Sequence, residues 1–113
     1  MADARSVISA YFNVERTYAF DVPGATVTTM VGEVLARNPN RLAVVFVNLG
    51  SNPVFIRPEG EAATTSGIRL AANGGGVAFS VVEDFLMPAA RWTAIASGGN
   101  STVYIAAVET FGA

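Results

Sequence analysis

Short apolar segments separated by loops rich in Gly, Asn and Ser dominate the chain from Leu42 onward. The segments carry many β-branched and aromatic residues, and no convincing helical stretch lies between them. This spacing predicts an antiparallel sandwich or barrel rather than βαβ units. We therefore expect an all-β fold, a single antiparallel β-sandwich that is jelly-roll-like. The expected strands are residues 42–48, 53–57, 67–71, 77–82, 91–96 and 102–108.

The loops between these segments carry the residue types of tight turns. Gly and Asn supply the positive φ values that a short reversal requires. The pattern thus predicts three consecutive hairpins. They join residues 42–48 to 53–57, 67–71 to 77–82, and 91–96 to 102–108. Residues 83–90 are expected to form a loop in which Phe85, Leu86 and Met87 either cover the end of the core or form an exposed contact.

The first 40 residues give a weaker pattern. Residues 17–22 alternate apolar side chains on one face and predict a strand that Pro23 and Gly24 end. A further strand is expected within residues 26–35. Residues 6–15 fit helical spacing and extended structure equally, so they form either an arm whose conformation depends on a partner or an ordinary edge strand. We expect an N-terminal arm at residues 1–16 and a β-sandwich domain at residues 17–113.

The length and charge of the chain indicate one domain that associates with other subunits. The 113 residues suffice for a single core. Charged residues make up only 14% of the chain, against roughly 25% in a typical soluble domain. All seven basic residues are Arg, which is enriched at protein interfaces, whereas Lys is depleted. These features favour a homo-oligomer or larger assembly, and a well-packed, Ala-rich monomer is the alternative.

Nucleic-acid and membrane partners are not expected. The net charge is −2, and the arginines are scattered singly along the chain, whereas nucleic-acid binding needs clustered basic residues. The longest central apolar run, residues 42–47, is far shorter than a membrane span. No secretory signal pattern is present at the N-terminus.

The composition excludes most catalytic chemistry. The chain has no Cys, His or Lys, which removes thiol nucleophiles, imidazole bases and Schiff-base lysines together. Glu59 with Glu61, and Glu83 with Asp84, are expected to be solvated loop carboxylates, although a bound Ca²⁺ stays open. Glu59 and Glu61 are expected to pair with Arg57 and Arg69 of the neighbouring strands. The alternative is that the two arginines clamp a carboxylate or phosphate. We expect no enzyme, no catalytic residue, no cofactor and no metal site.

A longer pattern resembles a known class of proteins. It runs through residues 38–56, 67–75, 91–96 and 101–105, as Asn-Pro-Asn-Arg, a strand, Asn-Leu-Gly-Ser, a strand, Gly-Ile-Arg-Leu and a Gly turn. This pattern is similar to that of the small β-sandwich virion proteins of tailed bacteriophages, among them capsid decoration or cement proteins. The resemblance covers roughly residues 37–109.

The resemblance implies a structural role on a capsid. It implies an oligomer, here expected to be a homotrimer, that binds the major capsid protein across neighbouring subunits on the virion surface after synthesis in the host cytoplasm. The expected partner-interface residues are Tyr11, Phe12, Tyr18 and Phe20, because aromatic side chains bury much area at low entropic cost.

Two other functions fit the same fold. One is a carbohydrate- or host-binding module of a phage fibre, with Trp92 and Tyr104 as stacking platforms, although a single Trp at strand spacing is more often part of the core. The other is a small head-completion or tail component, which the sequence does not separate from a decoration protein.

Overall fold

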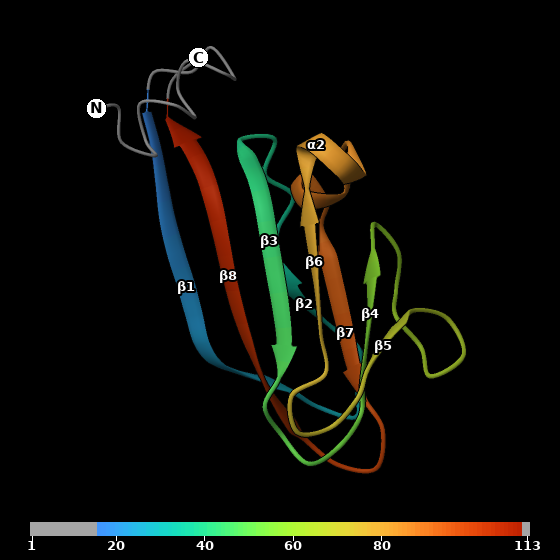
Figure 1. The fold of residues 1–113 in the computed structure, drawn as a ribbon. Helices are drawn as coiled ribbons and strands as arrows, with labels where there is room; N and C mark the ends of the chain where they lie inside the picture. Colours follow the sequence, from blue (N-terminus) through green and yellow to red (C-terminus); the bar gives the residue numbers. More distant parts are fainter. Residues whose placement is uncertain (1–15, 112–113) are drawn as a thin grey trace.

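Eight strands form two four-stranded antiparallel sheets in the computed structural model, which describes residues 16–111 (Figure 1). The first sheet has the order β1 (Arg16–Val27), β8 (Ser101–Phe111), β3 (Arg41–Asn48) and β6 (Gly76–Ser80). The second sheet has the order β2 (Gly32–Leu35), β7 (Trp92–Ala96), β4 (Val54–Pro58) and β5 (Ile68–Leu70). The predicted antiparallel β-sandwich is confirmed.

The strand pairs are nested within one another along the chain. β4 pairs with β5, β3 with β6, β2 with β7, and β1 with β8, so the chain forms one long double ribbon. The ribbon is rolled so that β8 also pairs with β3, and β7 with β4. An eight-stranded double sheet with this wrapped order is a jelly roll.

The three predicted hairpins are wrong. Each joins a strand of one sheet to a strand of the other: β3 to β4, β5 to β6, and β7 to β8. The loops at residues 49–53, 71–75 and 97–100 therefore cross between the sheets. Gly and Asn in a loop permit the chain to reverse direction, but they do not decide whether the returning strand pairs beside its predecessor or packs opposite it. The long-range pairing of β8 between β1 and β3 decides it here.

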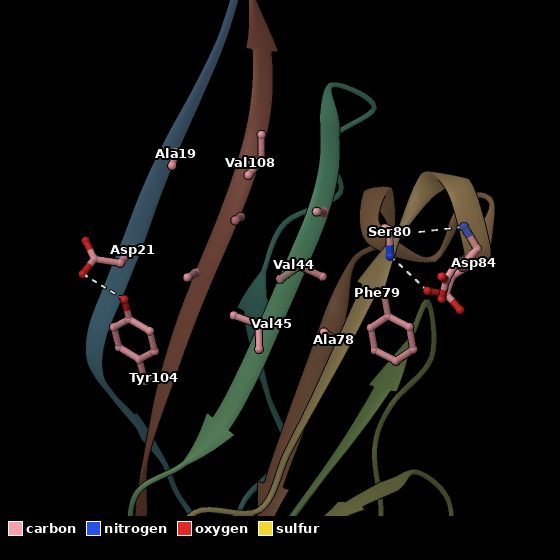
Figure 2. A pocket seen from close by; sticks show the side chains of 14 residues that line it. Ala19, Asp21, Val44, Val45, Ala78, Phe79, Ser80, Asp84, Tyr104 and Val108 are labelled. Atoms are coloured by element: carbon pink, nitrogen blue, oxygen red, sulfur yellow. Dashed lines mark hydrogen bonds between the residues drawn. The ribbon is translucent and has the colours of Figure 1, made fainter. Parts of the chain in front are cut away.

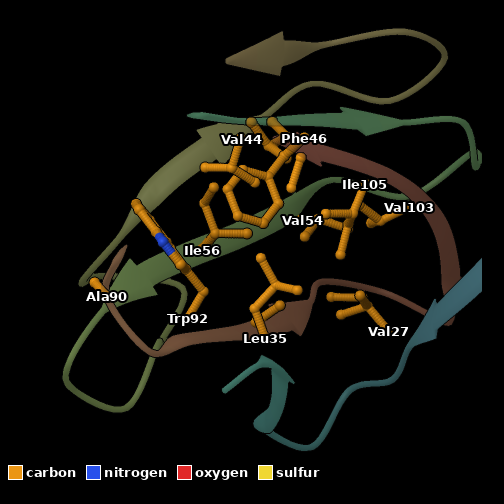
Figure 3. Close-up of a cluster of buried hydrophobic side chains, with 14 residues drawn as sticks. Val27, Leu35, Val44, Phe46, Val54, Ile56, Ala90, Trp92, Val103 and Ile105 are labelled. Carbon is orange, nitrogen blue, oxygen red and sulfur yellow. The ribbon is translucent and has the colours of Figure 1, made fainter. Parts of the chain in front are cut away.

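The hydrophobic core fills the space between the two sheets (Figure 3). Trp92 from the second sheet and Phe46 from the first are fully buried, with ring centroids 5.0 Å apart. Phe79 stacks on the same Trp92 ring, also at 5.0 Å. The indole Nε1 of Trp92 donates a hydrogen bond to the Met87 carbonyl at 3.2 Å. Trp92 is therefore a core residue and offers no surface on which a sugar could stack.

The N-terminal part of the sandwich differs from expectation in one respect. The strand predicted at residues 17–22 is present in β1, but Pro23 and Gly24 do not end it. The register against β8 shifts between Val22 and Ala25, and pairing then continues to Val27. An irregularity of this kind accommodates a proline on an edge strand, where its missing N–H breaks no ladder. The predicted arm lies outside the described residues, except for residue 16.

Two short helical turns occupy much of the segment expected to be a loop at residues 83–90, and the first of them begins within the strand expected at residues 77–82. They are α2 (Val81–Asp84) and a 3₁₀ turn at Met87–Ala89. Ser80 caps α2, since its side chain accepts a hydrogen bond from the Glu83 amide. These turns lie at the end of the first sheet where β6 stops (Figure 1).

Candidate functional site

The outer face of the first sheet is apolar although it does not contribute to the core. Side chains alternate between the two faces of a strand. In β3, Val44 and Phe46 are buried in the core, so Ala43 and Val45 point outward. In β8, Val103, Ile105 and Ala107 are buried in the core. The residues between and after them therefore point outward, namely Tyr104, Ala106 and Val108. A sheet with one solvated face normally alternates apolar and polar residues, and this sheet does not.

These outward residues form an open groove across the first sheet (Figure 2). Its volume is about 610 Å³. Alanines at positions 43, 78 and 106 form a low floor, because their side chains end at Cβ. We call this hollow the sheet groove, and its outward lining residues are Ala19, Asp21, Ala43, Val45, Ala78, Ser80, Tyr104, Ala106 and Val108.

The charged groups that line the sheet groove are all acidic. Asp21 lies on the β1 side and accepts a hydrogen bond from the Tyr104 hydroxyl at 3.4 Å. Glu83 and Asp84 lie on the opposite side in α2, where the Asp84 carboxylate accepts a hydrogen bond from the Ser80 amide at 3.0 Å. None of the arginines whose side chains the structure describes lines the groove. The groove thus combines an apolar floor with a negative rim.

An exposed apolar cluster lies beside the groove. Val82, Phe85 and Leu86 are 61%, 78% and 81% exposed, and together we call them the α2 cluster. Of the two expected alternatives, covering the core holds for Met87, which packs against the core, whereas Phe85 and Leu86 are exposed. Phe85 has φ 56° and ψ −111°, a conformation that favours glycine. The backbone turns sharply at Phe85, and the side chains of Phe85 and Leu86 lie in solvent.

The second sheet has charged residues at exposed positions of its strands, namely Glu33, Arg57 and Arg69, and further ion pairs lie in the loops at one of its ends. Arg91 contacts Glu33 at 2.6 Å and Glu61 at 3.3 Å, and Arg37 forms an ion pair with Glu59. The hydrogen bond from Arg37 lowers the pKa of Glu59 from its ordinary value. The hydrogen bond to Glu33 is the main cause of the raised pKa of Arg91. Ion pairs of this kind belong on a solvated face.

The expected partners of the loop carboxylates were wrong. Arg57 donates to the Glu61 carbonyl at 3.2 Å and to the Ser66 hydroxyl at 3.2 Å, not to a carboxylate. The two carboxylates pair with Arg37 and Arg91 because the loop after β4 folds back toward β7, where the Glu59 amide donates to the Arg91 carbonyl at 2.7 Å.

The predicted interface residues are placed only in part. Tyr11 and Phe12 lie outside the described residues. Tyr18 and Phe20 belong to β1, opposite Glu109 and Ala107 of β8. Of the groove residues, Tyr104, Glu83 and Asp84 were named from the sequence in other roles, and the apolar floor was missed. The signal that could have located this floor is the lack of polar alternation in residues 42–47 and 103–108.

The sheet groove can bind a partner by burying apolar surface. Within residues 16–111, no three acidic, His or Cys residues are grouped so that they could hold a metal ion. In the same part of the chain, no helix has the length and apolar character needed to cross a membrane.

Comparison with known proteins finds distant similarity among solved structures. No family model and no curated protein matches the chain. Among solved structures, a pilus protein of Bacillus endospore appendages has a TM-score of 0.45 at 17% identity, covering 85% of this chain and 86% of that chain. A Tobacco streak virus coat protein has a TM-score of 0.41 at 5% identity, covering 86% and 88%. A cupin protein from Bacteroides fragilis has a TM-score of 0.40 at 13% identity, covering 87% and 67%. At these scores the similarity assigns no function or partner to this chain.

Proposed function

We propose that this protein is a structural subunit that works by binding other protein subunits through the outer face of its first sheet. The observation that carries the proposal is the contrast between the two outer faces. The second sheet places the charged residues Glu33, Arg57 and Arg69 at exposed positions of its strands, whereas the first sheet has a floor of alanines and valines. Contiguous exposed apolar surface of this kind marks interaction sites.

The adjacent α2 cluster extends the apolar surface. Phe85 and Leu86 are large, exposed and next to groove residues Glu83 and Asp84. Holding Phe85 at a positive φ costs on the order of 1–3 kcal/mol. Strain of this kind is found mainly at residues that bind a ligand or partner. Because the cluster adjoins the groove, one partner can contact both surfaces.

The specific role we propose is that of a decoration or cement protein on a bacteriophage capsid. The sequence resemblance to small β-sandwich virion proteins supports it, and so does the low charge of the chain. The proposed partner is the major capsid protein, and the proposed state is a homo-oligomer such as a trimer on the virion surface. A binding role rather than an enzymatic one agrees with the lack of Cys, His and Lys in the sequence.

Co-sedimentation with tailed-phage capsids that lack their decoration proteins tests this role. We expect saturable binding by the full chain and loss of binding by Ala106→Arg, which puts a long charged side chain on the groove floor. Asp21, directly opposite Ala106 in β1, offers the new guanidinium a local partner, so the fold is retained. Ala71→Arg, at an exposed position in a crossing loop, is the matched control and should bind normally. Absence of binding by the full chain to every capsid tested would contradict the capsid role.

The carbohydrate-binding alternative loses its main candidate residue. Trp92 is fully buried between the sheets, and its indole N–H is already used. Tyr104 is half-buried on the groove side, with its hydroxyl bonded to Asp21. No pair of exposed aromatic rings therefore faces outward at these two positions.

A further inference from the structure

We propose that the sheet groove binds the outer face of the second sheet of another copy of this chain, so that copies stack front to back. The inference rests on the proposed function, in which the groove is an assembly surface, and it names the partner. We call the partner surface the back face, and its strand residues are Phe55, Arg57, Arg69 and Ile95.

The alternation of side chains along the strands builds the back face. In β4 the residues on both sides of Phe55 are buried in the core, so Phe55 and Arg57 point away from it. Phe55 lies opposite Ile95 of β7 and opposite Arg69 of β5. Because residues directly opposite each other share a face of the sheet, these three side chains form a row of two apolar groups and one cation.

The charge of the back face is opposite to that of the sheet groove. Arg57 and Arg69 are exposed, and neither takes part in an ion pair among residues 16–111. Glu33, the acidic strand residue of the second sheet, is neutralised by Arg91 at 2.6 Å. The groove rim has only acidic charges among the described side chains. Opposite charges on two faces of one molecule favour contact between the front of one copy and the back of the next.

The sizes of the side chains on the two faces are also complementary. Ala43, Ala78 and Ala106 leave the groove floor low, because their side chains end at Cβ. Phe55 and Ile95 are large side chains that are only partly buried within the single chain. Side chains interdigitate when two sheets pack face to face, and small residues opposite large ones fill the space between the sheets.

Contact between two grooves would be less favourable. It would bring two acidic rims together and place alanine against alanine. Contact between a groove and a back face is heterologous, so copies add head to tail and the last copy keeps a free groove. That free groove is available to the capsid protein of the proposed function.

A mixing experiment tests the proposal directly, because a contact between two different faces needs one intact face from each partner. Ala106→Arg blocks the groove and leaves the back face intact. Phe55→Glu blocks the back face and leaves the groove intact, and its carboxylate lies opposite Arg69, so a cross-strand ion pair retains the fold. We expect light scattering to give a monomer for each variant alone and a complex of two subunits for the equimolar mixture. Ala71→Glu, at an exposed position in a crossing loop, is the charge-matched control and should assemble like the unmodified chain.

Two results of this experiment would overturn the proposal. If Phe55→Glu assembles like the unmodified chain, the groove binds another occupant, such as a second groove or residues 1–15. Loss of assembly by Ala106→Arg would then still support the groove as the assembly surface, so the proposed function survives. If both variants are folded by thermal unfolding but stay monomeric when mixed, the groove and the back face do not pair. Stacks that form but bind no capsid would overturn the capsid role alone.

A second measurement uses the exposed cation of the back face and does not depend on Phe55→Glu. Arg69→Gln should weaken self-association by roughly 10-fold, because the arginine faces the acidic rim of the next copy. Arg37→Gln, which removes an exposed arginine in the loop after β2, is the matched control and should leave association unchanged. Equal association of the two variants in analytical ultracentrifugation would contradict a contact through the back face.

Discussion

Asn48 is a fully buried polar side chain at the end of β3. Its Nδ2 donates to the carbonyls of Asn52 at 2.8 Å and Leu70 at 3.1 Å. Its Oδ1 accepts from the Gly50 amide at 3.1 Å and the Ser101 hydroxyl at 2.7 Å. These four bonds satisfy the side chain and tie together the ends of all three loops that cross between the sheets.

We expect Asn48→Ala to lower the free energy of unfolding by about 3 kcal/mol, since buried donors and acceptors in three loops lose their partner. Asn52→Ala is the control. Its Nδ2 makes a single exposed hydrogen bond to the Asn100 carbonyl at 2.9 Å, so its loss should cost about 1 kcal/mol or less. Urea denaturation followed by Trp92 fluorescence measures both, and equal midpoints would contradict this role of Asn48.

Arg41 is the second buried polar side chain that connects distant segments. Its guanidinium donates to the carbonyls of Ala36 at 3.0 Å, Pro88 at 3.2 Å and Ala90 at 3.3 Å. Its Nε lies 3.7 Å from the Glu109 carboxylate in β8. Burial lowers the pKa of Arg41 from its ordinary value, and the charge of Glu109 opposes that shift.

We expect Arg41→Met to destabilise the fold by about 3–5 kcal/mol, because it removes the positive charge beside the buried Glu109 carboxylate and three hydrogen bonds to carbonyls. The double variant Arg41→Met/Glu109→Gln should recover part of this loss. Thermal unfolding of the two variants and of Glu109→Gln alone gives the coupling between the residues. A double variant no more stable than Arg41→Met would show that the charge of Glu109 is not the cause.

Phe85 combines exposure with a backbone conformation that favours glycine. Because the side chain is largely in solvent, Phe85→Gly should not weaken the core. We expect the change to raise the free energy of unfolding by about 1 kcal/mol through relief of strain, after the added flexibility of the unfolded chain is subtracted. Capsid binding should weaken at the same time. A loss of stability in chemical denaturation would indicate that Phe85 packs on the fold.

At the scale of elements, the sequence predicted strands better than it predicted their partners. Alternation and β-branched content identified β3, β4, β7 and β8, because both depend on neighbouring residues. The sheet to which each strand belongs depends on contacts between residues far apart in the chain, such as the pairing of Phe46 with Ile105. Local turn chemistry contains no information about such contacts, so the crossing loops were interpreted as hairpins.

Gly75 tests the packing of one crossing loop. A Cβ at this position would overlap the backbone nitrogen and oxygen of Ala71, and backbone cannot move aside as a flexible side chain can. We expect Gly75→Ala to cost about 1–3 kcal/mol. Gly32→Ala, where no atom lies within 4 Å of the new Cβ, should be neutral or slightly stabilising. Similar thermal midpoints for the two variants would mean that the loop is not tightly packed.

At the scale of the whole molecule, the two outer faces differ in charge. The low overall charge predicted an exposed apolar surface, but it did not locate that surface. Location required the topology, which places β1, β3, β6 and β8 side by side, so that their outward alanines and valines adjoin. The acidic rim from Asp21, Glu83 and Asp84 also depends on topology, because β1 and α2 are far apart in the chain.

The claim that this face assembles subunits is tested most directly by light scattering across a concentration series. For the full chain we predict an oligomer whose mass falls toward that of the 11.7 kDa monomer only on dilution. Ala106→Arg should remain folded and monomeric throughout, and Ala71→Arg should assemble like the unmodified protein. A full chain that stays monomeric at every concentration, or an Ala106→Arg variant that assembles normally, would contradict the account.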